Sequence, residues 1–397
     1  MRRIVAPLVA VMTLFVAFVT PARSAEAAPA CAGTPSGVPA AGSPQAGVPW
    51  AEQRYQPQRL SGIADGTGVV VAVLDSGVDG TSPLLHGRVL PGTDELGSGD
   101  GRLDCVGHGT AVASIIAASG SGDGFAGLAP RARILPVRVT EQEIVGGTVT
   151  GRPGTVAGLA GALRWAVAHG ARVLNVSLVV YQDTAVLRSA VADALAHDVV
   201  VVAAAGNGHS RGSGPDRVPY PAGYPGVLGV GAVGPDGQRL SESPIGPFVD
   251  VVAPGGSVVA AGEGKSLASY NGTSFATPFV SATAALIRQR DPGLPAAEVS
   301  ARILATADPV PDGRPSGGYG YGVVNPYRAV TESPDAAGPA SAPVPARVAP
   351  RPVATPAPVR GRAVALALAG AGLVALVVLA ATIVPRASRR RWRPGRG

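Results

Sequence analysis

Short apolar runs without polar interruption are the feature of this chain that most restricts its fold. They alternate with segments of helical periodicity: the apolar runs are 69–74, 173–178, 199–204 and 227–233, and the helical segments are 110–118, 156–168 and 187–196. Strands of this kind are buried on both faces, as in a parallel sheet covered by helices. The pattern predicts an α/β domain over residues 61–330, with a mainly parallel twisted sheet of about seven strands flanked by helices.

The N-terminal part of the chain differs from this pattern. Residues 1–25 begin with basic residues, continue with an apolar segment and end in small residues, which is the order of a secretory signal peptide. An uncleaved anchor helix is the alternative interpretation. Residues 26–60 are rich in Pro, Gly and Ala, and we expect them to form an extended N-terminal arm.

A second long hydrophobic segment lies near the C-terminus. Residues 331–362 read as a Pro-rich linker, and the run from Ala363 to Val384 that follows carries no charge. As a helix this run would be about 33 Å long, enough to cross a bilayer. The arginine-rich residues 385–397 would then stay in the cytoplasm. These features predict a single-pass protein of the cell membrane with residues 31–362 outside the cytoplasm.

The net charge of +7 does not indicate a nucleic-acid-binding protein. The basic excess lies in the two ends and the linker, whereas residues 31–330 contain slightly more acidic than basic residues. Nucleic-acid binding requires a basic surface on the folded part of a protein. We therefore expect no nucleic-acid partner.

The chain contains two cysteines, Cys31 and Cys105. In an exported protein two cysteines usually form a disulfide, and a pair of free thiols is the alternative. The predicted bridge would join the start of the mature chain to the loop just before His108.

Three short motifs contain residue types that nucleophilic catalysis needs. Asp75 ends an apolar run, His108 opens a helix of small residues, and Ser274 lies at the start of an apolar helix. A serine hydroxyl becomes a nucleophile when a base takes its proton, and a histidine can do so near neutral pH. A carboxylate beside the histidine holds its tautomer and stabilises its protonated form. The motifs therefore predict a triad with Ser274 as nucleophile, His108 as base and then acid, and Asp75 as the orienting group.

A fourth motif supplies a donor for the negative charge that develops during such a reaction. Asn207 follows the apolar run 199–204, and its side-chain NH₂ is suited to bind an oxyanion together with the backbone N–H of Ser274.

The order Asp75, His108, Asn207, Ser274 resembles the subtilisin family (the subtilases), and the resemblance covers residues 61–330. Any one of these motifs is weak alone, but the four in this order are specific. The resemblance implies a subtilisin-like α/β fold and a serine endopeptidase that cleaves protein or peptide substrates through an acyl-enzyme. It implies no metal and no organic cofactor in the chemistry.

Within the subtilases the chain resembles the mycosins of actinobacterial type VII secretion systems. The shared features are the arm segment that starts at Trp50, the pair Asp104 and Cys105 before the histidine, and the order of signal peptide, linker, membrane helix and basic tail. This resemblance implies an extracytoplasmic protease docked on a secretion complex, with an arm that wraps the catalytic domain and is held by the disulfide. The alternatives are a scaffold subunit with dispensable proteolysis and a housekeeping surface protease without a secretion partner.

The resemblance also implies which residues bind substrate. They are the strand residues that pair with a peptide and border the specificity pocket, and two residues before the oxyanion donor: Ser177, Leu178, Val179, Ala205 and Gly206. Many secreted subtilases have glycine in place of Val179, so we expect a narrowed site and no broad degradative activity.

Two further sequence features lie close to His108, a valine and an acidic stretch. Val106 stands where such chains often carry Asp, so we expect a local hydrogen bond to be missing. An acidic stretch precedes it and could bind Ca²⁺, as many subtilases do, but a solvated loop is the simpler interpretation; its members are Asp79, Asp94, Glu95, Asp100 and Asp104.

Overall fold

The computed structural model describes Cys31, Gly372 and Leu376, and the ranges 47–120, 124–145, 148–210, 215–262, 266–311 and 313–333. The chain divides into two units, residues 1–340 and 341–397. Of the second unit only Gly372 and Leu376 are described, and both are helical. The predicted signal peptide, linker and basic tail, and the rest of the predicted membrane segment, lie outside the described residues. None of the helices described is long and apolar enough to span a membrane.

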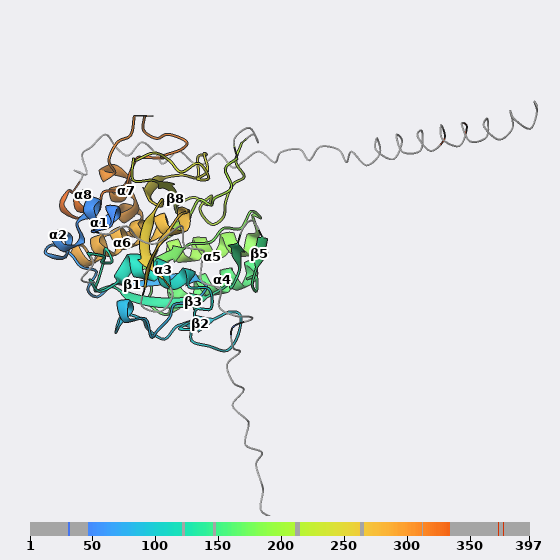
Figure 1. Cartoon of the computed structure of the whole chain (residues 1–397), viewed down its shortest axis with the longest axis horizontal. Coiled ribbons are helices and arrows are strands. Elements are labelled where there is room, and N and C mark those ends of the chain that lie inside the picture. Colours follow the sequence, from blue (N-terminus) through green and yellow to red (C-terminus); the bar gives the residue numbers. More distant parts are fainter. Residues whose placement is uncertain are drawn as a thin grey trace, which may run out of the picture. The chain divides into compact units, whose positions relative to one another are not determined.

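A seven-stranded parallel sheet forms the centre of the first unit (Figure 1), as predicted. Its strands, in spatial order, are β2 (Thr93–Asp94), β3 (Arg133–Arg138), β1 (Val70–Asp75), β6 (Val173–Val176), β7 (Val200–Ala204), β8 (Leu228–Val233) and β9 (Val251–Pro254). The four apolar runs of the sequence are β1, β6, β7 and β8.

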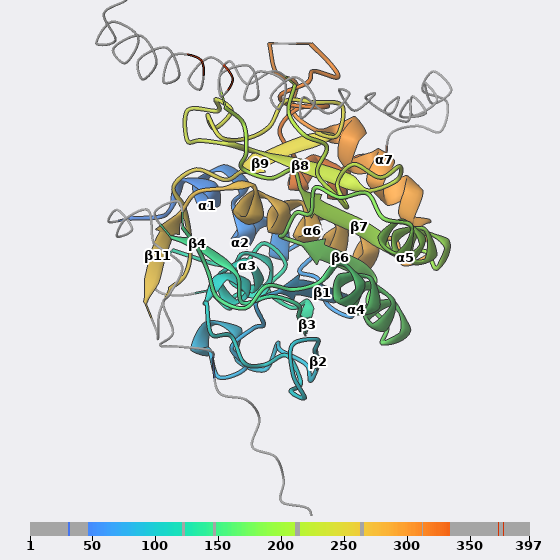
Figure 2. The same ribbon diagram turned by 90° about the vertical axis from the view of Figure 1, so that its right-hand side faces the viewer.

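Helices cover both faces of the sheet, which explains why its strands are apolar throughout. In β1, Val71 and Val73 pack in one core, whereas Ala72 and Leu74 pack in the other. The second core contains residues of α4 (Val156–Ala168) and α5 (Ala185–Ala196). Figure 2 shows these two helices on one side of the sheet and α6 (Thr273–Arg290) on the other.

The first core is built around α6, which is buried along almost its whole length and contacts β6, β7, β8 and β9. Other helices also pack on this core, among them α3 (His108–Ala117), α7 (Ala296–Thr306) and α8 (Pro326–Thr331). α3 and α6 contact each other, and both contact β1.

Two antiparallel hairpins and a short 3₁₀ turn were not predicted. The hairpins are β4 (Glu143–Val145) with β5 (Thr148–Thr150), and β10 (Val258–Ala261) with β11 (Leu267–Tyr270); the turn is η1 (Pro83–Leu85). The β4–β5 hairpin directly follows β3 in the chain and lies beside the functional site.

The described end of the arm is helical rather than extended, so that expectation is wrong for these residues. It forms α1 (Trp50–Tyr55) and α2 (Pro57–Ser61). Trp50 Nε1 donates to Gly256 O at 3.0 Å, and the Tyr55 ring packs on Phe279 of α6 at 5.4 Å. Proline at the first position of α2 has no N–H to leave unpaired, which favours a helix start there.

Candidate functional site

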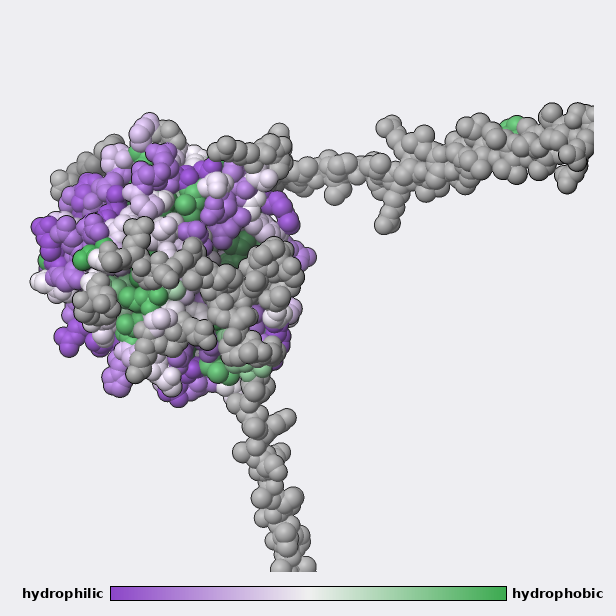
Figure 3. Space-filling model, viewed as in Figure 1, coloured by the Kyte–Doolittle hydropathy of each residue, from purple (hydrophilic) through white to green (hydrophobic). Residues whose placement is uncertain are grey.

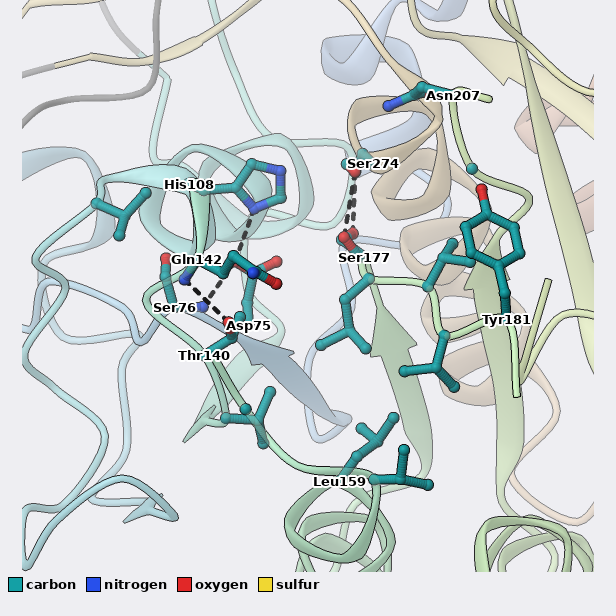
Figure 4. Close-up of a pocket in the computed structure, with 18 of the residues that line it drawn as sticks. Asp75, Ser76, His108, Thr140, Gln142, Leu159, Ser177, Tyr181, Asn207 and Ser274 are labelled. Atoms are coloured by element: carbon teal, nitrogen blue, oxygen red, sulfur yellow. Dashed lines mark hydrogen bonds and ion pairs between the residues drawn. The ribbon is translucent and has the colours of Figure 1, made fainter. Parts of the chain in front are cut away.

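The predicted catalytic residues meet at the carboxyl-terminal edge of the sheet, where parallel α/β sheets bind their ligands. Asp75 is the last residue of β1, His108 the first of α3, and Ser274 the second of α6. All three line one cavity of about 510 Å³ (Figure 4). The structure therefore brings together three motifs that lie far apart in the chain.

Asp75 and His108 form a close pair. Asp75 Oδ1 lies 2.7 Å from His108 Nδ1, and the same oxygen accepts a 2.7 Å hydrogen bond from the N–H of Ser76. The carboxylate is buried, whereas the imidazole remains 20% exposed. With Nδ1 directed at the carboxylate, the second ring nitrogen faces the side of the cavity that carries Ser274 (Figure 4). This arrangement suits a histidine base whose tautomer is fixed by the carboxylate of Asp75.

A glycine permits the close approach of α3 to β1. A Cβ atom added to Gly109 would lie 2.0 Å from Gly77 O and 3.0 Å from the Cβ of Asp75. Any side chain at this position would push the helix, and His108 with it, away from the carboxylate.

Asp104 anchors the first turn of α3. Its Oδ1 accepts hydrogen bonds from Ser76 Oγ at 2.8 Å, Gly107 N at 2.8 Å and Val106 N at 3.1 Å. Its Oδ2 accepts from Thr110 N at 2.8 Å and Thr110 Oγ1 at 2.5 Å. The N–H groups of Val106 and Gly107 are thus bonded to the carboxylate of Asp104, and the expected loss of a hydrogen bond because of Val106 stays a prediction.

Two opposing effects act on the charge of Asp104. Burial raises the pKa of its carboxyl group, and the hydrogen bonds from Thr110, Ser76 and Gly107 oppose that rise. Because all of its bonded neighbours act as donors, the ionised carboxylate is the form that satisfies them.

Ser274 is held at the start of α6 by a reciprocal contact with Ser177, the residue that follows β6. Ser274 Oγ donates to Ser177 O at 3.1 Å, and Ser177 Oγ donates to Ser274 O at 2.9 Å (Figure 4). Gly272 precedes the helix with φ of 135°, a conformation that favours glycine. The nucleophile candidate thus sits at a helix N-terminus, where N–H groups and the helix dipole favour developing negative charge.

The side chain of Asn207 is oriented by the residue before Ser274. Asn207 Oδ1 accepts hydrogen bonds from Thr273 N at 2.9 Å and Thr273 Oγ1 at 3.2 Å. The amide nitrogen therefore points the other way, toward the part of the site between His108 and Ser274 (Figure 4). The position is that of an oxyanion donor, as the sequence predicted.

One wall of the cavity contains most of the predicted substrate-binding residues. Ser177, Leu178, Val179 and Gly206 all line it. An added Cβ at Gly206 would lie 3.5 Å from Val179 Cγ2, so the valine packs over this glycine and narrows the space beside it.

Ala205 does not fit its predicted role. It is completely buried and packs with Val233 and Phe248, and it is not among the described residues that line the cavity. Ala205 thus presents no side chain to the cavity, whereas Gly206, which has φ of 95°, lines it.

Tyr181 on this wall, and all the residues of the opposite wall, line the cavity but were not predicted from the sequence. The opposite wall is formed by residues after β3 and at the start of α4: Val139, Thr140, Gln142, Gly154, Thr155, Val156 and Leu159. The signal that could have located them is their place after the carboxyl end of a parallel strand. β4 and β5 have only three residues each, too few for a strand pattern to be visible in the sequence.

Cys31 and Cys105 form the predicted disulfide, with Cα atoms 5.5 Å apart. The acidic stretch is only partly a solvated loop, because Asp94 is buried and Asp104 is half-buried. Asp94 pairs with Arg138 at 2.7 Å, and the more exposed Asp100 pairs with Arg102. Over the described ranges, no group of three or more His, Cys, Asp or Glu side chains is arranged to hold a metal ion.

Polar residues cover most of the described surface on the face in Figure 3, and hydrophobic residues appear there in small separate patches. Six large hydrophobic side chains are exposed in the described part of the chain: Val48, Leu103, Tyr181, Val186, Ile245 and Tyr327, with Leu376 in the second unit as a seventh. Tyr181 is the one of these that also lines the cavity, and Arg217 stacks over its ring at 4.4 Å.

Comparison with known proteins agrees with this geometry. A model of the subtilase family matches residues 66–322. Mycosin-1 of Mycolicibacterium smegmatis is 35% identical, with 86% of this chain and 85% of mycosin-1 covered. Subtilisin BL of Lederbergia lenta is 37% identical, with 70% of this chain and 97% of the subtilisin covered.

Solved structures lead to the same family. One, described as the serine protease MycP1, an essential component of the type VII (ESX-1) secretion system, has a TM-score of 0.62 and 33% identity. The match covers 74% of this chain and 92% of that one. With the family match, the shared fold and the site geometry in agreement, this chain belongs to the subtilase family of serine proteases and is a homologue of the mycosins.

Proposed function

We propose that this serine protease is a membrane-anchored endopeptidase that works outside the cytoplasm in association with a type VII secretion complex. The observation that carries the catalytic part is the constellation of Asp75, His108, Ser274 and Asn207 around one cavity. Its substrates are peptide bonds in proteins or peptides.

Each residue has a defined role in the proposed reaction. His108 takes the Ser274 proton while Ser274 Oγ attacks the substrate carbonyl, and the protonated imidazole is stabilised by Asp75. The oxyanion of the tetrahedral intermediate accepts hydrogen bonds from Asn207 Nδ2 and the Ser274 N–H. The C–N bond then breaks as His108 gives its proton to the leaving amine, which leaves an acyl-enzyme. Water hydrolyses this ester by the same proton transfers in reverse.

The substrate contacts follow from the cavity lining. Ser177, Leu178 and Val179 offer an extended backbone on one side, and the packing of Val179 over Gly206 favours small side chains next to the scissile bond. This supports limited proteolysis rather than general degradation.

Sequence features and the homologues support the proposed location. The uncharged run from Ala363 to Val384 and the arginines after it predict one membrane crossing with the tail inside. The disulfide between Cys31 and Cys105 is typical of an oxidising compartment. Similarity to MycP1, described as an essential component of a type VII secretion system, supports the secretion partner.

The first test is labelling of the full-length chain in membranes with a fluorophosphonate probe, with Ser274→Ala as the control. Labelling of the wild type and not of the variant is expected. A folded, disulfide-bonded wild type that stays unlabelled would contradict the catalytic proposal. Asn207→Ala should still be labelled but should turn over peptide about 10²–10³-fold more slowly, the range for loss of one oxyanion donor.

A genetic test separates catalysis from the scaffold alternative. If proteolysis is needed, Ser274→Ala should fail to restore secretion to a deletion strain. Full restoration by this variant, together with failure of a strain that lacks the whole chain, would favour the scaffold function.

A further inference from the structure

The wall of the cavity opposite Ser177 and Val179, formed by residues after β3 and at the start of α4, is here called the second wall. A buried arginine lies directly behind it. Arg138 ends β3, is the register partner of Asp75, and is completely inaccessible to solvent. Its Nη1 donates to Asp94 Oδ2 at 2.7 Å, its Nη2 donates to Glu141, and the same nitrogen lies 3.3 Å from Cys105 Sγ. One guanidinium thus contacts a sheet strand, the cavity wall and the disulfide.

Glu141 connects this arginine to the surface of the wall. Its neighbours in the chain, Thr140 and Gln142, line the cavity, while its own carboxylate is buried on the opposite side. Glu141 Oε2 accepts a 3.0 Å hydrogen bond from Arg152 Nε, and Arg152 Nη1 reaches the carbonyl of Leu96 at 3.1 Å. Asp94, Arg138, Glu141 and Arg152 are here called the ion network.

Backbone contacts hold the same wall segment, residues 139–142. The N–H of Val139 donates to Asp75 O, and the N–H of Glu141 donates to Arg152 O, both at 2.8 Å. Added Cβ atoms at Gly151 and Gly154 would lie 2.0 Å from the carbonyl oxygens of Glu141 and Val139 respectively. The segments on either side of the β4–β5 hairpin are therefore packed backbone against backbone.

The ion network carries two positive and two negative groups, three of them buried, and Arg152 is 33% exposed. Buried ion pairs add little net stability, because desolvation offsets their attraction. Their hydrogen bonds are directional, however, and a planar guanidinium holds its partners in fixed places. The network is thus better suited to fixing a position than to stabilising the fold.

We propose that the ion network is the specificity-determining support of the second wall. It fixes residues 139–142 at the distance from Ser177 and Val179 that an extended peptide requires, and it does not act on the bond-breaking step. The inference rests on the proposed endopeptidase function. Arg138, Glu141 and Arg152 are accordingly positioning residues, and their loss should weaken binding of long substrates.

The test compares two substrates in the full-length enzyme and in Arg152→Gln. One substrate is a peptide long enough to contact both walls, and the other is a single-residue ester that reaches only Ser274. For the peptide, KM should rise on the order of tenfold, the size expected for loss of one charged hydrogen-bonded contact. For the ester, kcat and the rate of fluorophosphonate labelling should stay within about twofold.

Two variants are matched controls. Arg164→Gln removes another arginine that reaches a backbone carbonyl, on the outer surface of α4, and should change neither substrate. Arg152→Lys keeps the charge and should restore part of the peptide KM. Glu141→Gln is the second probe, because it removes the central charge with little change in shape; it should raise the peptide KM further.

Three results would overturn the inference. These are an unchanged peptide KM in both Arg152→Gln and Glu141→Gln, equal losses for peptide and ester, and loss of kcat alone. A wild type that is not labelled and cleaves neither substrate would refute the proposed function, whereas an active wild type with unaffected variants would refute only the role of the network.

Discussion

Two carboxyl groups in this protein, the half-buried Asp104 and the buried Glu52, lie in contrasting surroundings. Asp104, before the catalytic helix, accepts hydrogen bonds on both oxygens from backbone and hydroxyl donors. Glu52, on arm helix α1, is 4% exposed, and its Oε2 has no hydrogen-bond partner in the part of the chain that is described. Burial raises the pKa of Glu52 to about 8. Burial thus raises the pKa of both carboxyl groups, but hydrogen-bond donors oppose the rise at Asp104, whereas none reaches Oε2 of Glu52 in the described part of the chain.

The two carboxyl groups belong to two different regions, the first turn of the catalytic helix α3 and the arm helix α1. Asp104 links the start of α3 to Ser76, whose N–H in turn binds Asp75, so it connects the elements that carry two catalytic residues. Because burial raises the pKa of Glu52 to about 8, we expect the docking of the arm to depend on pH. The disulfide between Cys31 and Cys105 joins the arm to the loop that contains Asp104. Four predictions follow from this contrast, in order of expected size.

Removal of the disulfide should have the largest effect. A bridge between residues 74 apart in sequence should contribute up to about 4–5 kcal/mol to the free energy of unfolding, since it restricts the unfolded chain. Cys31→Ser should lower Tm clearly in a thermal melt, and reduction of the wild type should lower it equally. An unchanged Tm would mean that arm and catalytic loop are not coupled through this bond.

Ionisation of Glu52 should come next. The folded-state pKa of about 8 lies above the ordinary 4.5, so the folded state holds this proton more strongly. Stability is then highest at low pH and falls as the pH rises from about 4.5 through 8, by on the order of 4 kcal/mol. Glu52→Gln should flatten this dependence and be more stable than wild type at pH 8, as measured by chemical unfolding at several pH values.

The exposed Glu298 of α7 provides the control for that experiment. Glu298→Gln should leave the pH dependence of stability as it is in the wild type. If both variants behave alike, Glu52 is not the group responsible.

Asp104→Asn should affect catalysis. The new NH₂ group would face the Thr110 donors, so the first turn of α3 loses part of its anchor. We expect kcat for peptide hydrolysis to fall about 10- to 100-fold with KM little changed. Asp100→Asn, in the same loop but paired with Arg102 near the surface, should be nearly normal. Normal kcat in Asp104→Asn would show that His108 is positioned without this carboxylate.

The smallest effect should come from the surface ion pair of the arm. Arg54 Nη2 lies 2.9 Å from Asp308 Oδ2, but both side chains are about one-third exposed. Arg54→Ala should therefore lower the free energy of unfolding by less than about 1 kcal/mol. A larger loss would mean that charge, rather than burial of residues such as Tyr55, holds the arm in place.

The sequence predicted the central sheet because strands buried on both faces have to be apolar at every position. Asp75, His108 and Ser274 were identifiable because each is a reactive side chain at the end of an apolar strand or at the start of an apolar helix. Asn207 was identifiable from its place after β7.

The second wall and the ion network were not predicted. Residues 139–142 are ordinary in composition, and their function depends on how β3 lies beside β1 and on glycines 151 and 154 that allow close packing. Two of the partners of Arg138 cannot be read from spacing, because Asp94 and Cys105 approach it from separate segments, whereas Glu141 lies only three residues after it. Ala205 was assigned to the substrate site although it is completely buried, because the sequence does not show which residues after β7 face the cavity.

The chain order of the catalytic residues has a consequence for synthesis. Asp75 and His108 belong to elements near the start of the domain, whereas Ser274 lies on α6, which forms the centre of the first core and contacts five strands that precede it in the chain, β1, β6, β7, β8 and β9. A nascent chain that has been made only as far as β9 has an acid and a base but no nucleophile. We therefore expect proteolytic activity only after α6 has been made and packed into the first core.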